Sequence, residues 1–296
     1  MPSARKPLVV IGSANMDLLT RVQAFPRPGE TMPGSALLQR PGGKGANQAI
    51  AAAQVGASVS FVGNIGTGAF GDALVANLEQ AGIDLSHLER SSKLPAGTAL
   101  ILLNKAGENE IVVTRSSNEL VGVAQIKRSK QLIQGAGMLL LQMEIPLASV
   151  QAAIALAHAA KVPVVLNPAP CTKPLTQKLL KQVDWLTPNE HELTALTGKR
   201  VKTMTDVAVA AQHLLSQGAR NVVVTCGAKG ACWVTRDKVT WFPAPRVKVI
   251  DTVGAGDCFN GVFAAGLCAS KTINQALSQA VARASSLISR VRKPVR

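Results

Sequence analysis

Short apolar runs alternate with longer stretches of helical period over the middle of the chain, from about residue 124 to 225. This alternation is typical of a parallel β-sheet whose two faces are covered by helices. The expected strands are 138–143, 162–166, 184–186 and 221–225, and the expected helices are 124–134, 147–160, 175–181 and 206–217. The pattern predicts an α/β fold for this part of the chain.

The first 120 residues also contain segments of the α/β pattern, but two predicted β-hairpins interrupt it. Strands at 8–11 and 60–63 and helices at 48–55 and 70–82 continue the α/β pattern, and 12–17 is expected to be a polar loop. Two pairs of alternating segments, 18–40 and 98–115, instead predict β-hairpins. We expect these hairpins to form a small sheet apart from the main core.

The rest of the chain completes one domain. Two β-segments, 231–235 and 239–242, precede a helix that opens at Asp257, and a final amphipathic helix covers 273–290. No repeat or low-complexity linker divides the chain. We therefore predict a single α/β domain over 1–296, a three-layer αβα sandwich with a mostly parallel central sheet. The small sheet is inserted from about 18–40 and 97–116.

Composition narrows the class of protein. No apolar run is long enough to span a bilayer, and the first residues lack the core of a signal peptide. Five cysteines form no C-x-x-C pair, which favours a reducing compartment, and we expect a cytoplasmic protein. The formal net charge is +15, but basic residues cluster only in the tail 290–296, without interleaved aromatics. A basic surface that favours anionic small-molecule substrates, or that merely aids solubility, explains the charge better than nucleic-acid binding, which stays open only for the tail.

The most informative stretch is 248–261. An apolar run ends at Asp251, the turn Gly254-Ala255-Gly256 follows, and Asp257 opens a helix. Free N–H groups at a helix N-terminus attract anions, and a carboxylate beside them can accept a proton from a hydroxyl that attacks a phosphoryl group. The alternative is that Asp257 merely caps the helix.

Further polar residues follow other strand ends, where parallel strands commonly open onto a ligand crevice. Asn15 and Asp17 could bind a polyol or simply form a turn. The loop 42–47 is rich in glycine but lacks the spacing of a phosphate-binding P-loop. Asn189 and Glu192 could form a capping box, or Glu192 could hold Mg²⁺ through water.

Five motifs occur together in an order that resembles the ribokinase-like (PfkB) family of carbohydrate kinases. They are Gly12-Ser13-x-Asn15-x-Asp17, Gly42-Gly43-Lys44-Gly45-Ala46-Asn47, Asn167-Pro168-Ala169-Pro170, Asn189-x-x-Glu192 and Asp251-Thr252-x-Gly254-Ala255-Gly256-Asp257. The resemblance spans about 8–288. It implies ATP-dependent phosphorylation of a pentose at its terminal hydroxymethyl oxygen, with D-ribose as the expected sugar and deoxyribose as the alternative.

The resemblance also implies roles for individual residues. Asp257 matches the catalytic base, and Gly254, Ala255 and Gly256 match the anion hole. The sugar-binding positions are Asn15, Asp17, Gly43, Lys44, Asn47, Glu144 and Asp257. The nucleotide-binding positions are Asn189, Thr225, Gly227, Lys229, Gly230 and Gly256. Glu192 would hold Mg²⁺ through water, and Asp251 with the Val253 carbonyl would hold part of a K⁺ site. The small sheet would be a lid that also forms a homodimer contact.

The chain departs from the family pattern at two places. Ser116-Ser117-Asn118 stands where the family usually has Gly-Ala-Asn, and 291–296 stands where it has a Gly-Ala loop, a Ser, a Pro and a further helix. In the family that loop completes the adenine wall and half of the K⁺ site, with Leu287 and Arg290 at remaining carbonyl positions. We therefore expect both ATP binding and activation by K⁺ to be weaker in this chain than in the family. A sugar-binding protein without kinase activity is the alternative.

Overall fold

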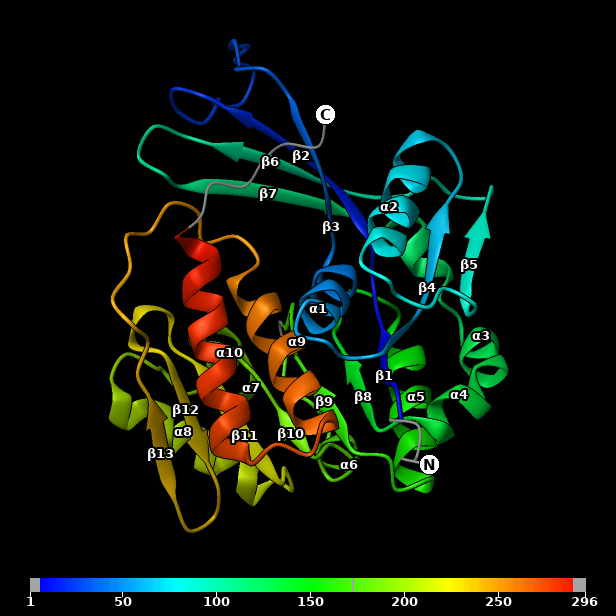
Figure 1. Ribbon diagram of the computed structural model, residues 1–296. Coiled ribbons are helices and arrows are strands. Elements are labelled where there is room, and N and C mark those ends of the chain that lie inside the picture. The colour runs from blue at the N-terminus through cyan, green and yellow to red at the C-terminus, as the bar shows by residue number, and fades with distance from the viewer. Residues whose placement is uncertain (1–5, 172, 290–296) are drawn as a thin grey trace.

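The computed structural model describes residues 6–171 and 173–289. Within them the chain forms a large sheet of nine strands, covered by helices, and a small sheet of four strands (Figure 1). The large sheet with its helices is called the body below. The small sheet lies across the end of the body toward which β1 runs, and only short connections join the two.

The large sheet is parallel over most of its width. Its order is β13-β12-β11-β10-β9-β8-β1-β4-β5, with antiparallel pairing only between β11, β12 and β13. The strands are β1 Leu8–Ile11, β4 Val59–Gly66, β5 Leu88–Ser91, β8 Met138–Leu141, β9 Val164–Leu166, β10 Trp185–Leu186, β11 Asn221–Thr225, β12 Ala231–Val234 and β13 Val239–Phe242. Parallel strands share a carboxyl edge, so the loops that follow β1, β8, β9, β10 and β11 meet there.

The small sheet has the order β3-β2-β6-β7. Its strands are β2 Asn15–Arg21, β3 Leu38–Gly42, β6 Gly97–Leu103 and β7 Asn109–Thr114. Strands β2 and β3 form one antiparallel hairpin, and β6 and β7 form the other, as the alternating segments predict. The parallel pairing of β2 with β6 joins the hairpins.

Helices cover both faces of the large sheet because its strands are apolar on both sides. Val9 and Ile11 of β1 face one core cluster, and Leu8 and Val10 face the other. The first cluster includes α3 Val123–Arg128, α4 Lys130–Gly135, α5 Leu147–Ala159, α6 Gln177–Leu180, α7 Glu190–Thr197 and α8 Met204–Ser216. The second includes α1 Lys44–Ala53, α2 Ala69–Gln80, α9 Ala255–Cys268 and α10 Ile273–Ile288. Two short 3₁₀ helices, η1 Ser116–Leu120 and η2 Gly227–Lys229, complete the set.

The predicted three-layer α/β fold with a small additional sheet is confirmed, with local corrections. The loop expected at 12–17 is wrong in its second half, because Asn15 and Asp17 lie on β2. Pairing with β3 and β6 turns this polar segment into a strand. The helix expected at 124–134 breaks at Ser129, and β5 was not predicted. The basic tail lies outside the described residues. Within the described ranges no helix is long and apolar enough to cross a membrane.

Candidate active site

The carboxyl edge of the large sheet brings together polar residues from distant parts of the chain. A cavity of about 200 Å³ opens there, and its lining is mostly polar. Eight of the predicted site residues line it: Lys44, Asn189, Glu192, Thr225, Gly254, Ala255, Gly256 and Asp257. Asn167, Ala169, Thr252 and Asn260 complete the wall. The strand ends and the start of α9 therefore form one site rather than scattered loops.

Asp257 is one of the residues of this wall. It lies in the first turn of α9 and is only 7% exposed. Its carboxylate accepts two hydrogen bonds, from Asn47 Nδ2 at 3.1 Å and from Gln48 Nε2 at 3.0 Å. Both donors belong to α1, which packs against α9. The two amides fix the orientation of the carboxylate and leave it free lone pairs for a hydroxyl proton.

A buried network of amides supports this arrangement. Gln142 Nε2 donates to Gln48 Oε1 at 2.7 Å, and Gln48 Nε2 also donates to Asn167 Oδ1 at 3.1 Å. Asn167 Nδ2 donates to the Thr187 carbonyl, and the Thr187 hydroxyl donates to Asn260 Oδ1. Asn260 Nδ2 closes the chain on the Gly256 carbonyl at 2.9 Å. The hydrogen bonds from Gln48 to Gly256 hold these amides in one geometry, whereas the buried Gln142 Oε1 has no hydrogen-bond partner among the described residues.

The turn before α9 has the conformation of an anion site. Gly254 is the N-cap residue and has φ 69°, a left-handed conformation that favours glycine. The Ala255 N–H donates to the Thr252 carbonyl at 3.3 Å, so this donor of the predicted anion hole is partly engaged. The Gly256 N–H has no acceptor among the described residues. With the helix dipole, it can receive negative charge that develops beside Asp257.

A second polar region adjoins Asp257 on the side of the small sheet. The Glu144 carboxylate accepts hydrogen bonds from the Ser13 hydroxyl at 2.6 Å and from the Lys44 N–H at 3.0 Å. Asn15 Oδ1 accepts a hydrogen bond from Asn118 Nδ2 at 2.8 Å, so the Asn15 amide group is turned to donate elsewhere. These contacts bring the loop after β8, the start of β2 and the start of α1 together.

Close backbone approach shapes this second region. Gly43 has φ 90°, and a Cβ there would lie 2.6 Å from the Asn15 backbone nitrogen. At Gly42 a Cβ would overlap the Asp17 carboxylate. Only glycine allows the start of α1 to reach β2 so closely. The predicted sugar-binding residues Asn15, Asp17 and Gly43 therefore lie close to the start of α1, where Lys44 and Asn47 lie near Asp257.

Lys44 is the cation between the two regions. Burial alone would lower the pKa of its ammonium group, but nearby carboxylates outweigh that effect and raise the pKa of Lys44 above its ordinary value. In order of effect, these carboxylates belong to Asp257, Glu144, Glu192 and Asp17. Lys44 therefore remains charged at neutral pH and can balance an incoming anionic group.

Asn189 and Glu192 form the capping box of α7. Asn189 Oδ1 accepts the Glu192 N–H at 2.8 Å, and Glu192 Oε2 accepts the Asn189 N–H at 2.9 Å. Glu192 also lines the cavity, where burial raises the pKa of its carboxyl despite the Asn189 N–H and the Lys44 charge. The capping alternative is therefore correct, and it leaves Glu192 beside the cavity. A desolvated carboxylate gains from a nearby hydrated cation, so this position fits Mg²⁺ held through water.

The remaining predicted nucleotide-binding residues extend from the same edge. Thr225 bridges to Asn189, and its N–H donates to the Pro188 carbonyl at 3.0 Å. Gly227 and Gly230 have φ 52° and 98° and let η2 turn tightly. Lys229 Nζ lies 3.5 Å from Glu190 Oε1 at the surface. Thr225 lines the cavity, while the η2 turn continues beyond it.

The residues predicted to hold K⁺ are differently arranged. Asp251 Oδ1 accepts the Val253 N–H at 3.0 Å, and Asp251 Oδ2 lies 3.6 Å from Arg40 Nη1. A guanidinium therefore already faces this carboxylate.

The cysteines beside the glycine turns serve packing. Cys226 is buried, and burial raises the pKa of its thiol to about 12. Cys258 packs against the core cluster that contains α9. A thiol with so high a pKa is a poor nucleophile, which agrees with the packing role predicted for Cys226.

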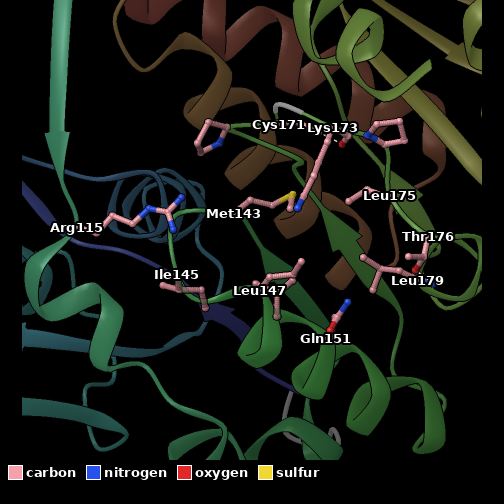
Figure 2. Close-up of a pocket in the computed structure, with 13 residues that line it drawn as sticks. Arg115, Met143, Ile145, Leu147, Gln151, Cys171, Lys173, Leu175, Thr176 and Leu179 are labelled. Atoms are coloured by element: carbon pink, nitrogen blue, oxygen red, sulfur yellow. Dashed lines mark hydrogen bonds between the residues drawn. The ribbon is translucent and has the colours of Figure 1, made fainter. Parts of the chain in front are cut away.

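A separate cavity of about 550 Å³ lies beside the candidate site (Figure 2). Its wall is mostly apolar, with Met143, Ile145 and Leu147 along it and the side chains of Arg115 and Lys173 directed into it. It contains none of the residues predicted to bind sugar or nucleotide. Phosphoryl transfer needs positioned charged groups, so the polar cavity is the better candidate for the active site although it is the smaller of the two.

Several residues around the site were not predicted, including Gln48, Asn118 and Asn260. Gln48 and Asn260 form the network around Asp257, and Asn118 orients Asn15. Gln48 could have been found, because it is the only strongly polar side chain between Ala46 and Ala53 apart from Asn47. The partners of Asn118 and Asn260 depend on tertiary packing, and no local pattern indicates them.

Comparison with known proteins identifies the family. The profile described as pfkB family carbohydrate kinase matches residues 5–292. A ribokinase of Haemophilus influenzae is 38% identical over 273 residues, 92% of this chain and 89% of the relative. A deoxyribokinase of Salmonella typhi is 36% identical over 274 residues, 93% and 90% of the two chains.

Solved structures agree with this assignment. The structure of Arabidopsis thaliana ribokinase complexed with ribose and ATP has 32% sequence identity and a TM-score of 0.90, covering 96% of this chain and 93% of that one. The chain belongs to the pfkB family of carbohydrate kinases.

Proposed function

We propose that this pfkB carbohydrate kinase transfers the γ-phosphoryl group of ATP to O5 of D-ribose, giving ADP and D-ribose 5-phosphate. The observation that carries the proposal is the Asp257 carboxylate, fixed by Asn47 and Gln48 at the start of α9. The Gly254–Gly256 turn lines the same cavity, as does Lys44, whose N–H donates to Glu144. A hydroxyl in this cavity would meet a base and an anion site together.

Each part of the site has a task in this reaction. Asp257 accepts the proton of the attacking hydroxyl, and the Gly256 N–H and the α9 dipole stabilise the charge that develops on the phosphoryl oxygens. Asn15, Asp17, Gly43, Asn47 and Glu144 hold the sugar hydroxyls. Lys44 neutralises negative charge between sugar and phosphate. Asn189, Thr225 and the Gly227–Gly230 turn hold the nucleotide.

Magnesium is the cofactor that the site accommodates best. Glu192 lines the cavity together with Asp257, and one carboxylate acting through water suffices, because Mg²⁺ usually keeps several waters. When bound, the ion shields the phosphate charges of ATP. Within this proposal, Glu192 orients those waters, and Asn189 keeps Glu192 in place.

The small sheet is proposed to act as a lid and to pair with a second copy of the chain. Leu100 and Val112 lie opposite each other in the β6–β7 register and are 49% and 61% exposed. Apolar side chains this exposed on neighbouring strands suit a homodimer contact. The opposite face, which carries Asp17, would exclude water from the bound sugar.

The decisive experiment measures ADP release with D-ribose and magnesium-ATP and identifies the product by ³¹P NMR. Ribose 5-phosphate as product supports the proposal. Calorimetric ribose binding without ATP binding would instead establish a sugar-binding protein without kinase activity.

The second candidate substrate is 2-deoxyribose, favoured by the likeness to the Salmonella deoxyribokinase. Asn15 argues for ribose, because its amide group, oriented by Asn118, would lose a partner with a sugar that lacks a hydroxyl. Measuring kcat/KM for each sugar decides between them. A higher kcat/KM for 2-deoxyribose than for ribose would reverse the assignment.

A further inference from the structure

Arg40 connects the small sheet with the body through an ion pair. It lies on β3, and its Nη1 is 3.6 Å from Oδ2 of Asp251, which precedes α9. The two side chains are 23% and 27% exposed, so most of the pair is shielded from water. A partly buried pair is screened less by salt than a surface pair and holds its geometry better.

Asp251 in turn organises the segment that leads to the anion site. Its Oδ1 accepts the Val253 N–H at 3.0 Å. The N–H groups of Ile250 and Asp251 both donate to the Ile288 carbonyl at the end of α10, at 2.8 and 3.2 Å. The carboxylate that Arg40 holds therefore fixes the beginning of the turn whose Gly254–Gly256 portion faces the phosphoryl group.

The register of the small sheet links Arg40 to the sugar side as well. Arg40 lies directly opposite Asp17 in the β2–β3 pairing, so both side chains emerge from the same face. Arg40 Nε is buried and has no hydrogen-bond acceptor among the described residues. A buried donor without a partner is uncommon, and it leaves this guanidinium able to bind a further acceptor.

We propose that Arg40 is a positioning residue for phosphoryl transfer. From the small sheet it holds Asp251 and thereby the Gly254–Gly256 turn, so that the turn is ordered when the sheet lies against the body. Its guanidinium supplies the positive charge at Asp251 in place of a monovalent cation, because a second cation there would be repelled. This inference rests on the proposed kinase function, and it disagrees with the K⁺ site expected at Asp251 and Val253.

The first test is steady-state kinetics with ribose and magnesium-ATP at constant ionic strength, in potassium or in tetramethylammonium. Wild type should turn over equally in both salts. Arg40→Ala should lower kcat by about 10- to 100-fold, the cost of a misplaced catalytic group, with a smaller change in the KM for ribose. Arg40→Lys and added guanidinium should each restore part of kcat. Arg21→Ala, at an exposed arginine of the same sheet, is the matched control and should stay within about twofold.

The second test uses thermal unfolding without ligands. The midpoints of Arg40→Ala, Asp251→Asn and the double variant should show coupling, with the double variant no less stable than the worse single variant. Potassium should raise the midpoint of Arg40→Ala and leave that of wild type unchanged.

Three results would overturn the inference. In the first, Arg40→Ala has the same kcat and the same unfolding midpoint as Arg21→Ala. In the second, the midpoint changes of Arg40→Ala and Asp251→Asn add up in the double variant. In the third, potassium activates the wild type several-fold. Failure of the proposed function looks different, because wild type would then turn over neither pentose while the unfolding cycle still reports on the pair.

Discussion

On the body side, Asp257 is almost fully buried and held by two amides, and a chain of hydrogen bonds runs behind it from Gln48 to the Gly256 carbonyl. On the other side, all six residues of β7 are exposed, and apolar Leu100 and Val112 face water. The body side is therefore ordered before any ligand arrives, whereas the small sheet lacks contacts that a ligand or a second chain would supply. Changes on the body side, and at Arg40 where the small sheet contacts the body, should affect the chemical step, whereas changes on the exposed face of the small sheet should affect assembly.

The largest effect is expected at Asp257. Asp257→Asn removes the proton acceptor but keeps the volume, so kcat should fall by about 10² to 10⁴ while ribose binding measured by calorimetry changes little. Circular dichroism and the thermal midpoint serve as folding controls. Near-normal turnover would show that Asp257 is not the catalytic base and serves only to hold α9 against α1.

A smaller loss is expected behind the carboxylate. Gln48→Met removes one of the two bonds to Asp257 and leaves Gln142 and Asn167 without their partner, so kcat should fall about 10- to 100-fold and stability by about 1–3 kcal/mol. Gln54→Met, at an exposed position after the same helix, is the control. If both variants behave alike in an ADP-release assay, the body side does not depend on this network.

Glu192 should set how activity depends on magnesium and pH. Glu192→Gln should raise the magnesium concentration for half-maximal rate about tenfold. Because burial raises the pKa of Glu192, wild type should lose magnesium affinity as pH falls through that raised value, at a pH where an exposed glutamate is still ionised. The variant should lack this dependence.

The raised pKa of Glu192 also predicts how the free energy of unfolding depends on pH. The folded state binds the Glu192 proton more tightly than the unfolded state, so this residue's contribution to stability decreases as pH rises from the unfolded to the folded pKa. A pH series of urea midpoints for wild type and Glu192→Gln measures it. Parallel curves for the two proteins would contradict the assignment.

On the small sheet, Val112→Lys should change association more than chemistry. A charge at the centre of the proposed contact should give monomers in light scattering, while turnover per chain falls less than tenfold. Glu110→Lys, at an exposed position of the same strand near its end, is the control. Unchanged mass for Val112→Lys would place any dimer contact elsewhere.

The smallest effect is expected where the small sheet joins the body. Ser116 has φ 46°, a left-handed conformation that is unfavourable for serine. Ser116→Gly should raise the free energy of unfolding by about 1 kcal/mol, read from urea midpoints. Ser270→Gly, at a second serine with positive φ (58°), tests whether the gain is general to such positions. A destabilised Ser116→Gly protein would mean that the serine makes compensating contacts.

The large sheet could be predicted because the strands from β8 to β11 are short apolar runs that alternate with helical segments along the chain. Strand β5 was missed because Leu88–Ser91 alternates weakly and is a strand only through its pairing with β4. Residues of the candidate site were found where a motif holds them, as at Lys44 and Asp257. Arg40 was missed because its partner lies more than two hundred positions along the chain, and nothing local distinguishes it from the other arginines.

The contacts of Asp257 also have a consequence for biosynthesis. The residue is separated from Asn47 and Gln48 by 210 and 209 positions, so its setting needs the early and late parts of the chain together. The ribosome synthesises α1 long before α9, so the Asn47 and Gln48 amides lack their carboxylate partner until Asp257 has been made. A nascent chain thus has no competent centre until synthesis has passed residue 257 and α9 has docked on α1. Catalytic activity should consequently be among the last properties to appear during refolding, which makes it a sensitive reporter of complete assembly.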